Sequence, residues 1–164
     1  RNTANSMITK LFITAEQVKA TTSISSGTDN DPIEQKIYYA QKTDVLRVLG
    51  LDLYNKIYTD LSTNTPLTGE YLKIFDEYLI DMHVFFTAHY FVLFNEVKVG
   101  NTGNTVPTSG SWQPSSKTVA LSEQYKSLAI SVENNFREYM KNSTLTEWGY
   151  CQKSTETTNF NDFY

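Results

Sequence analysis

Cysteine, proline and long uncharged apolar runs are scarce in this chain. Its 164 residues contain one cysteine, Cys151, so no disulfide can form within a single copy. Four prolines and seven glycines give few signals for turns and loops. Fourteen basic residues against eighteen acidic ones give a net charge of −4. This charge argues against a protein that binds nucleic acid tightly through its phosphates.

The most apolar run is too short and too polar to predict a membrane span. Residues 78–94 read YLIDMHVFFTAHYFVLF and include Asp81, His83 and His89. A spanning helix needs about 20 largely uncharged residues, and this run has 17. We therefore expect no membrane partner.

The sequence also gives no sign of a metal or catalytic site. His83 and His89 are six residues apart, which is about 240° around a helix, so they are poorly placed to share an ion. We find no nucleophile motif and no phosphate-binding glycine loop. We expect no metal, no cofactor and no enzymatic activity, with both histidines hydrogen-bonded in a core or an interface.

Apolar periodicity and capping signals predict a mainly α protein. Thr14 and Gln17 have the spacing of a capping box before a short helix over 15–20. A longer helix is expected over 31–49, with Asp31 as its cap, Pro32 in first position and Gly50 as its stop. Its buried stripe should contain Ile33, Ile37, Tyr38, Ala40, Val45, Val48 and Leu49.

Three further helical segments are predicted. They cover 51–61, 68–97 and 118–141. The last has a stripe of Leu121, Tyr125, Leu128, Val132, Phe136 and Met140. The fold class is therefore a small bundle of about four helices with a long central helix, a protruding loop or β-hairpin and an extended C-terminal arm. We expect a helical domain over 1–142, with the insertion at about 97–117, and the arm over 143–164.

The central helix is apolar nearly all round, which raises the question of what covers it. A four-helix unit of this size has few elements with which to cover one helix on every side. We therefore expect neighbouring copies to bury part of it, at Tyr78, Phe85, Phe86, Tyr90 and Phe94.

Isolated aromatic residues outside the helices are candidates for docking a partner. Trp112 lies in the polar loop, where it either contacts a partner or covers its own hairpin. Trp148, Phe160, Phe163 and Tyr164 lie in the expected arm. A disordered end would usually lack such residues, so we expect the arm to dock onto another protein.

The order of these segments resembles a known family. ITAEQVKA (13–20), VLRVLGLDLYNKIY (45–58) and FNEVKVGNTGN (94–104), followed by an amphipathic helix, are similar to the head-to-tail connector (adaptor) ring proteins of tailed phages, in particular those of crAss-like phages. LGLDLYNKI (49–57) matches the family's leucine-glycine-x-x-leucine-tyrosine signature, and VKVGNTG (97–103) resembles its turn out of the long helix. The resemblance covers about residues 8–142.

The resemblance implies a structural virion protein at the head–tail junction, made in the host cytoplasm. It implies a ring of about twelve copies between the portal protein and other connector or tail rings, with double-stranded DNA passing through without specific binding. The loop would face the channel or a neighbour, with Lys98, Asn101, Asn104 and Lys117 as candidate channel residues, unless these lysines are simply solvated. The arm would reach an adjacent ring.

Two other classes of function stay open at this point. The chain could be a helical adaptor, monomeric or dimeric, that recruits a protein through Trp112 and the tail. It could also be an enzyme whose site is assembled between subunits.

Overall fold

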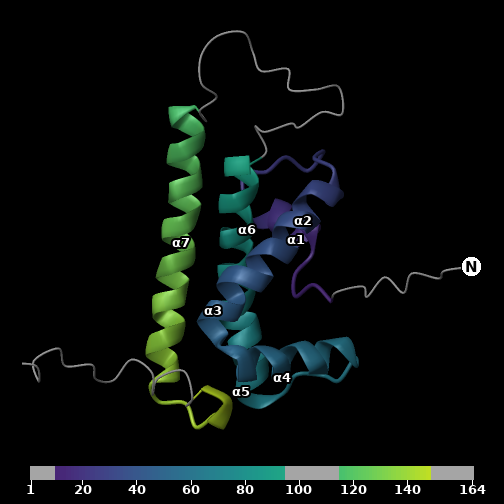
Figure 1. Cartoon of the computed structure of the whole chain (residues 1–164), viewed down its shortest axis with the longest axis vertical. Helices are drawn as coiled ribbons and strands as arrows, with labels where there is room; N and C mark the ends of the chain where they lie inside the picture. Colours follow the sequence, from purple (N-terminus) through teal and green to yellow (C-terminus); the bar gives the residue numbers. More distant parts are fainter. Residues whose placement is uncertain (1–9, 95–114, 149–164) are drawn as a thin grey trace, which may run out of the picture.

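Two long helices that run side by side in opposite directions form the body of the molecule (Figure 1). The computed structural model describes residues 10–94 and 115–148. In chain order these form α1 (Ala15–Thr21), α2 (Asn30–Ala40), η1 (Gln41–Val45), α3 (Leu46–Leu49), α4 (Leu51–Ser62), α5 (Gly69–Ile74), η2 (Phe75–Leu79), α6 (Ile80–Phe94) and α7 (Ser116–Met140). The described residues contain no strand, and the predicted mainly helical bundle is confirmed. The central and longest helices are α6 and α7, and α2 and α3 cross in front of α6 (Figure 1).

The two helix starts predicted near the N-terminus have different outcomes. Thr14 caps α1 as expected: its side chain accepts a hydrogen bond from the Gln17 backbone, and the Gln17 side chain accepts one from the Thr14 backbone. The predicted cap of α2 is wrong, because the helix begins at Asn30 and its N-cap is Asp29. Asp31 therefore lies in the first turn, where its charge still favours the positive end of the helix.

Gly50 separates α3 from α4, as predicted. Its φ of 74° and ψ of 162° lie in a region open almost only to glycine. The chain can therefore change direction between two helices without a loop. Leu49 and Leu53, on either side of the break, are both buried in the core.

Two π-helical turns were not predicted. In η1 the Gln41 side chain is buried, accepts a hydrogen bond from the Phe12 backbone at 2.9 Å, and donates to the Lys10 carbonyl and the Tyr54 hydroxyl. This polar contact ties the N-terminal segment to α4. The second π turn, η2, joins α5 to α6 in one continuous helical path.

The chain itself covers most of α6, which corrects the argument that sibling copies must do so. Met82 and Phe86 belong to a core shared with α3, α4 and α7, whereas Val84, Ala88 and Phe91 belong to one shared with α1 and α2. Two helical layers therefore meet on opposite sides of α6. Asp81 and Phe94 are the α6 residues that are exposed, and several others are half-buried.

The folded unit continues past residue 142. Trp148 is 4% exposed and packs edge-on against Phe136, with ring centroids 5.1 Å apart. Tyr71 donates a hydrogen bond to Glu147 at 2.7 Å, which holds the same segment onto α5. Residues 143–148 therefore belong to the helical body and not to an arm. The expected hairpin and the rest of the arm lie outside the described residues.

Candidate interaction surfaces

A group of aromatic side chains lies on the side of α6 that faces α2. Tyr90 packs edge-on against Tyr39, with centroids 4.8 Å apart, and stacks on Phe94 at 6.2 Å. Tyr39 is 48% exposed and Phe94 is 43% exposed. The Lys36 ammonium lies 5.2 Å from the centre of the Phe94 ring, a cation–π distance.

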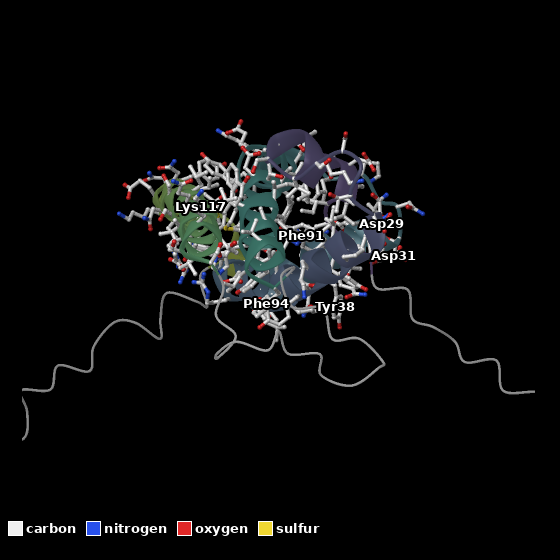
Figure 2. All side chains as sticks on the ribbon, turned by 90° about the horizontal axis from the view of Figure 1, so that it is seen from above. Asp29, Asp31, Tyr38, Phe91, Phe94 and Lys117 are labelled. Carbon is white, nitrogen blue, oxygen red and sulfur yellow. The ribbon has the colours of Figure 1, made fainter. Side chains whose placement is uncertain are left out.

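Tyr38 extends this group on α2. It is 46% exposed, and Figure 2 shows that its side chain projects on the same side of the molecule as Phe94. Phe91, three residues before Phe94, lies inside the bundle in the same view. We call Lys36, Tyr38, Tyr39, Tyr90 and Phe94 together the aromatic surface.

Asp44 holds Tyr90 in place at the edge of the aromatic surface. The Tyr90 hydroxyl donates a hydrogen bond to Asp44 at 2.7 Å. Burial, followed by the bond to this carboxylate, raises the pKa of Tyr90 to about 12. Tyr90 therefore keeps its proton across the physiological pH range, and its hydroxyl continues to donate to Asp44.

An ionic cluster joins α3 to α7, and it borders the aromatic surface because Asp44, the acceptor of the Tyr90 bond, also pairs with Arg47 at 3.5 Å. Arg47 donates two hydrogen bonds to the Glu133 carboxylate, at 3.0 and 2.9 Å. Arg137 donates two more to the same group from one helical turn away. We call Arg47, Glu133 and Arg137 the arginine clasp.

The clasp turns its guanidinium groups outward, although two largely buried acids balance their charge: Glu133, and Asp44, which lies 3.5 Å from the Arg47 guanidinium. The side chain of Glu133 is 9% exposed, whereas those of Arg47 and Arg137 are 51% and 42% exposed. Burial alone raises the pKa of Glu133, but the bonds from both arginines outweigh it and leave the pKa below its ordinary value. The same hydrogen bonds to Glu133 raise the pKa of Arg47 above its ordinary value. The cluster therefore stays ionised, with its guanidinium groups toward solvent.

The residues predicted as a subunit interface are dispersed. Tyr90 and Phe94 lie together in the aromatic surface. Phe86 is 3% exposed within its own core, so it is not available to a neighbouring copy, and that assignment is wrong. Phe85 is half-buried, and Tyr78 is half-buried against Tyr139, away from the aromatic surface.

The other predicted site residues are mostly not described. Trp148 is a core residue and not a docking residue, because α7 and the preceding turn bury it. Lys117 is exposed at the start of α7 (Figure 2). Trp112, Phe160, Phe163, Tyr164, Lys98, Asn101 and Asn104 lie outside the described residues.

Tyr38 and Leu128 correct the predicted stripes. Both were expected to be buried, yet they are 46% and 47% exposed. Tyr38 follows the buried Ile37, and the next position along a helix points about 100° away. Leu128 lies at the edge of the α7 stripe, where the spacing from Tyr125 to Val132 alternates between three and four residues.

Both histidines are hydrogen-bonded core residues, as expected. His83 Nε2 lies 3.0 Å from the Ile37 carbonyl oxygen, and His89 Nδ1 lies 2.8 Å from the Ser122 hydroxyl. Burial lowers the pKa of His83 to about 4, so it is neutral and Nε2 carries the proton that it donates to Ile37. Within the described part of the chain, no group of three or more potential ligands is placed to hold a metal ion.

No helix in the described ranges, 10–94 and 115–148, combines the length and apolar character needed to cross a bilayer. What the described surface does offer is exposed aromatic and cationic side chains from α2, α3, α6 and α7. This arrangement is suited to contact with another protein.

Comparison with known proteins gives one relationship. No curated protein and no solved structure matches the chain. A family model described as a family of unknown function, DUF6712, matches residues 45–158, which is more than half of the sequence. The matched region contains the Gly50 break, the central helix α6 and the whole of α7. The chain therefore belongs to the DUF6712 family.

Proposed function

We propose that this protein is a structural subunit of a head-to-tail connector ring in a tailed phage. About twelve copies form a ring between the portal protein and other connector or tail rings, and double-stranded DNA passes through the ring without specific binding. The protein acts by assembly and not by catalysis. The resemblance of residues 49–57 and 97–103 to connector proteins supports this proposal.

The observation that carries the proposal is the amount of large apolar surface left exposed. In the described part of the chain, eight large apolar residues are at least 40% exposed: Tyr38, Tyr39, Leu51, Leu72, Phe94, Val119, Leu128 and Ile130. Single exposed apolar residues are ordinary, but grouped ones mark contact surfaces. Tyr38, Tyr39 and Phe94 form such a group, and Ile130 lies one turn before Glu133 of the adjacent clasp.

The charge of the chain fits a conduit. A net charge of −4 disfavours tight binding of phosphates, which would hold DNA back during its passage. We place the insertion at 97–117 toward the channel or a neighbour. Lys117, which is exposed, is the described residue that would frame it.

The C-terminal arm is the proposed contact with an adjacent ring. Because the folded unit continues to Trp148, we assign this role to residues 149–164, with Phe160, Phe163 and Tyr164 as the anchoring side chains. Peptides that add to a partner commonly use such apolar anchors.

The experiment is a mass measurement of the purified full chain combined with electron microscopy. The proposal predicts a closed ring with a central hole and a mass that is a whole multiple of 18.7 kDa. A monomer at every attainable concentration would contradict the ring and favour a helical adaptor. Deletion of 149–164 should leave the ring intact and weaken its attachment to other virion proteins.

A further inference from the structure

A second exposed surface lies on α5, η2 and the start of α6. Leu72 is 43% exposed, and Asp76, Glu77 and Asp81 are exposed. The adjacent Asp76 and Glu77 lie four and five residues after Leu72 and five and four residues before Asp81. Along a helical path that includes a π turn, this spacing places the four residues on one side. We call them the acidic surface.

The carboxylates of the acidic surface are not neutralised by any basic side chain of residues 10–94 and 115–148. None of its three carboxylates forms an ion pair or hydrogen bond with a described residue. Lys73, the nearest base in the sequence, places its ammonium 4.8 Å from the centre of the Tyr139 ring of α7. The surface therefore combines exposed negative charge with an apolar residue.

The acidic and aromatic surfaces lie on opposite sides of α6. His83 faces α2, because its ring contacts the Ile37 carbonyl, and Tyr90, seven residues later, shares that side. Asp81 precedes His83 by two residues, which is about 200° around an α-helix. One subunit therefore has exposed carboxylates on one side of α6. On the opposing side it has Lys36 and two guanidinium groups that are more exposed than their partners Asp44 and Glu133.

We propose that the aromatic surface of one copy packs against the acidic surface of a second copy. This inference rests on the proposed function and names the contact that would close the ring. Tyr38, Tyr39 and Phe94 would supply apolar area opposite Leu72, and Lys36 and the outward guanidinium groups of the clasp would face the carboxylates.

Charge explains why the contact pairs unlike surfaces. Two aromatic surfaces face to face would oppose Lys36, Arg47 and Arg137 of one copy to those of the other, and two acidic surfaces would oppose carboxylates. Like charges brought together oppose association, whereas complementary surfaces favour it. A head-to-tail contact between unlike surfaces gives rings when its rotation closes.

Cross-linking between two variants tests the pairing. In a Cys151→Ser background, which has no other cysteine, one protein carries Tyr38→Cys and the other Asp81→Cys. The two are mixed, allowed to assemble, and treated with a short bis-maleimide. We expect a cross-linked dimer in the mixture, several-fold above that in either variant alone. The matched control replaces Asp81→Cys by Asn55→Cys, an exposed position on α4, and should give no more than background.

The outcomes separate this inference from the proposed function. If the protein assembles but the mixture gives no more dimer than the Asn55→Cys control, the pairing is overturned and the ring stands. If Tyr38→Cys alone cross-links as strongly as the mixture, like surfaces meet and the pairing is again overturned. If the parent protein does not assemble at all, the proposed ring fails, and this inference fails with it.

Charge reversal gives an independent readout. Lys36→Glu and Asp81→Lys should each lower the assembled fraction several-fold, and mixing the two variants should recover part of it, because each reversed surface then meets an oppositely charged partner. Asp52→Lys, at an exposed acid on α4, is the matched control and should assemble like the parent. No recovery in the mixture, or an equal loss with Asp52→Lys, would overturn the pairing.

Discussion

Arg47 and Glu133, 86 residues apart in the sequence, form a two-point ion pair with bonds of 3.0 and 2.9 Å. The pair joins the short helix α3, just before the Gly50 break, to the C-terminal half of α7. It therefore connects the first half of the chain to the last long helix, and it does so beside the aromatic surface proposed to receive a second copy.

The clasp should contribute measurably to stability. Glu133→Gln removes the charge that two arginines share, and we expect the free energy of unfolding to fall by about 1–2 kcal/mol, with both arginines partly screened by water. Urea denaturation followed by circular dichroism measures the change. Glu138→Gln is the control, because Glu138 and its partner Lys141 are both well exposed, and it should change stability by at most about 0.5 kcal/mol. Equal losses in the two variants would argue against the clasp.

Acid should weaken the fold through His83. Its pKa falls from an ordinary 6.5 to about 4 in the folded protein because of burial. Between these values the unfolded chain binds a proton that the folded chain does not, so stability falls as the pH drops from 6.5 toward 4 and levels off below that. The expected contribution is about 3 kcal/mol.

Replacing His83 should remove this part of the pH dependence. His83→Gln keeps a side-chain donor for the Ile37 carbonyl but does not titrate. The slope of unfolding free energy against pH between 4 and 6.5 should therefore be smaller in the variant. A proton NMR titration of the two histidines provides a direct check, and a His83 pKa near 6.5 in the folded state would refute the argument.

Much of the helical architecture could be predicted because its signals are local. The Thr14 capping box, the Gly50 stop and the buried positions Ile33 and Ile37 follow from spacing and backbone preference alone. The buried contacts of Gln41 in the π turn could not be predicted, because its side chain meets Phe12 and Tyr54 only after folding.

The candidate surfaces could be predicted only in part. Tyr90 and Phe94 were identified from the apolar character of α6, but their exposed neighbour Tyr39 was missed, because which side of α2 faces α6 is decided by tertiary packing. The same limit explains why Phe86 and Trp148 were predicted to contact partners although both are buried in the core. Each is a large apolar residue whose cover comes from segments distant in the sequence.

Gly50 should not tolerate a side chain. Its φ of 74° and ψ of 162° would strain any other residue, so Gly50→Ala should cost about 1–3 kcal/mol. Gly27→Ala is the control, since an added Cβ would meet only the Ser25 hydroxyl at 3.8 Å, an ordinary contact. Thermal unfolding of both variants measures the difference. Equal melting temperatures would contradict the assigned backbone conformation.

The end of the folded unit can be located by truncation. A chain that ends at 148 should be as stable as the full chain, whereas one that ends at 142 loses Trp148 from the core and should be about 3 kcal/mol less stable. Denaturant midpoints of the two chains give the comparison. Equal stability would return the boundary to residue 142.

The proposed ring depends on self-assembly through surfaces that a single copy leaves exposed. Native mass spectrometry of the purified chain tests this most directly. We predict one dominant closed oligomer of about twelve copies of the 18.7 kDa chain, reduced to smaller species by Lys36→Glu. A spectrum that contains the monomer alone, at low salt and at the highest concentration attainable, would contradict the proposed ring.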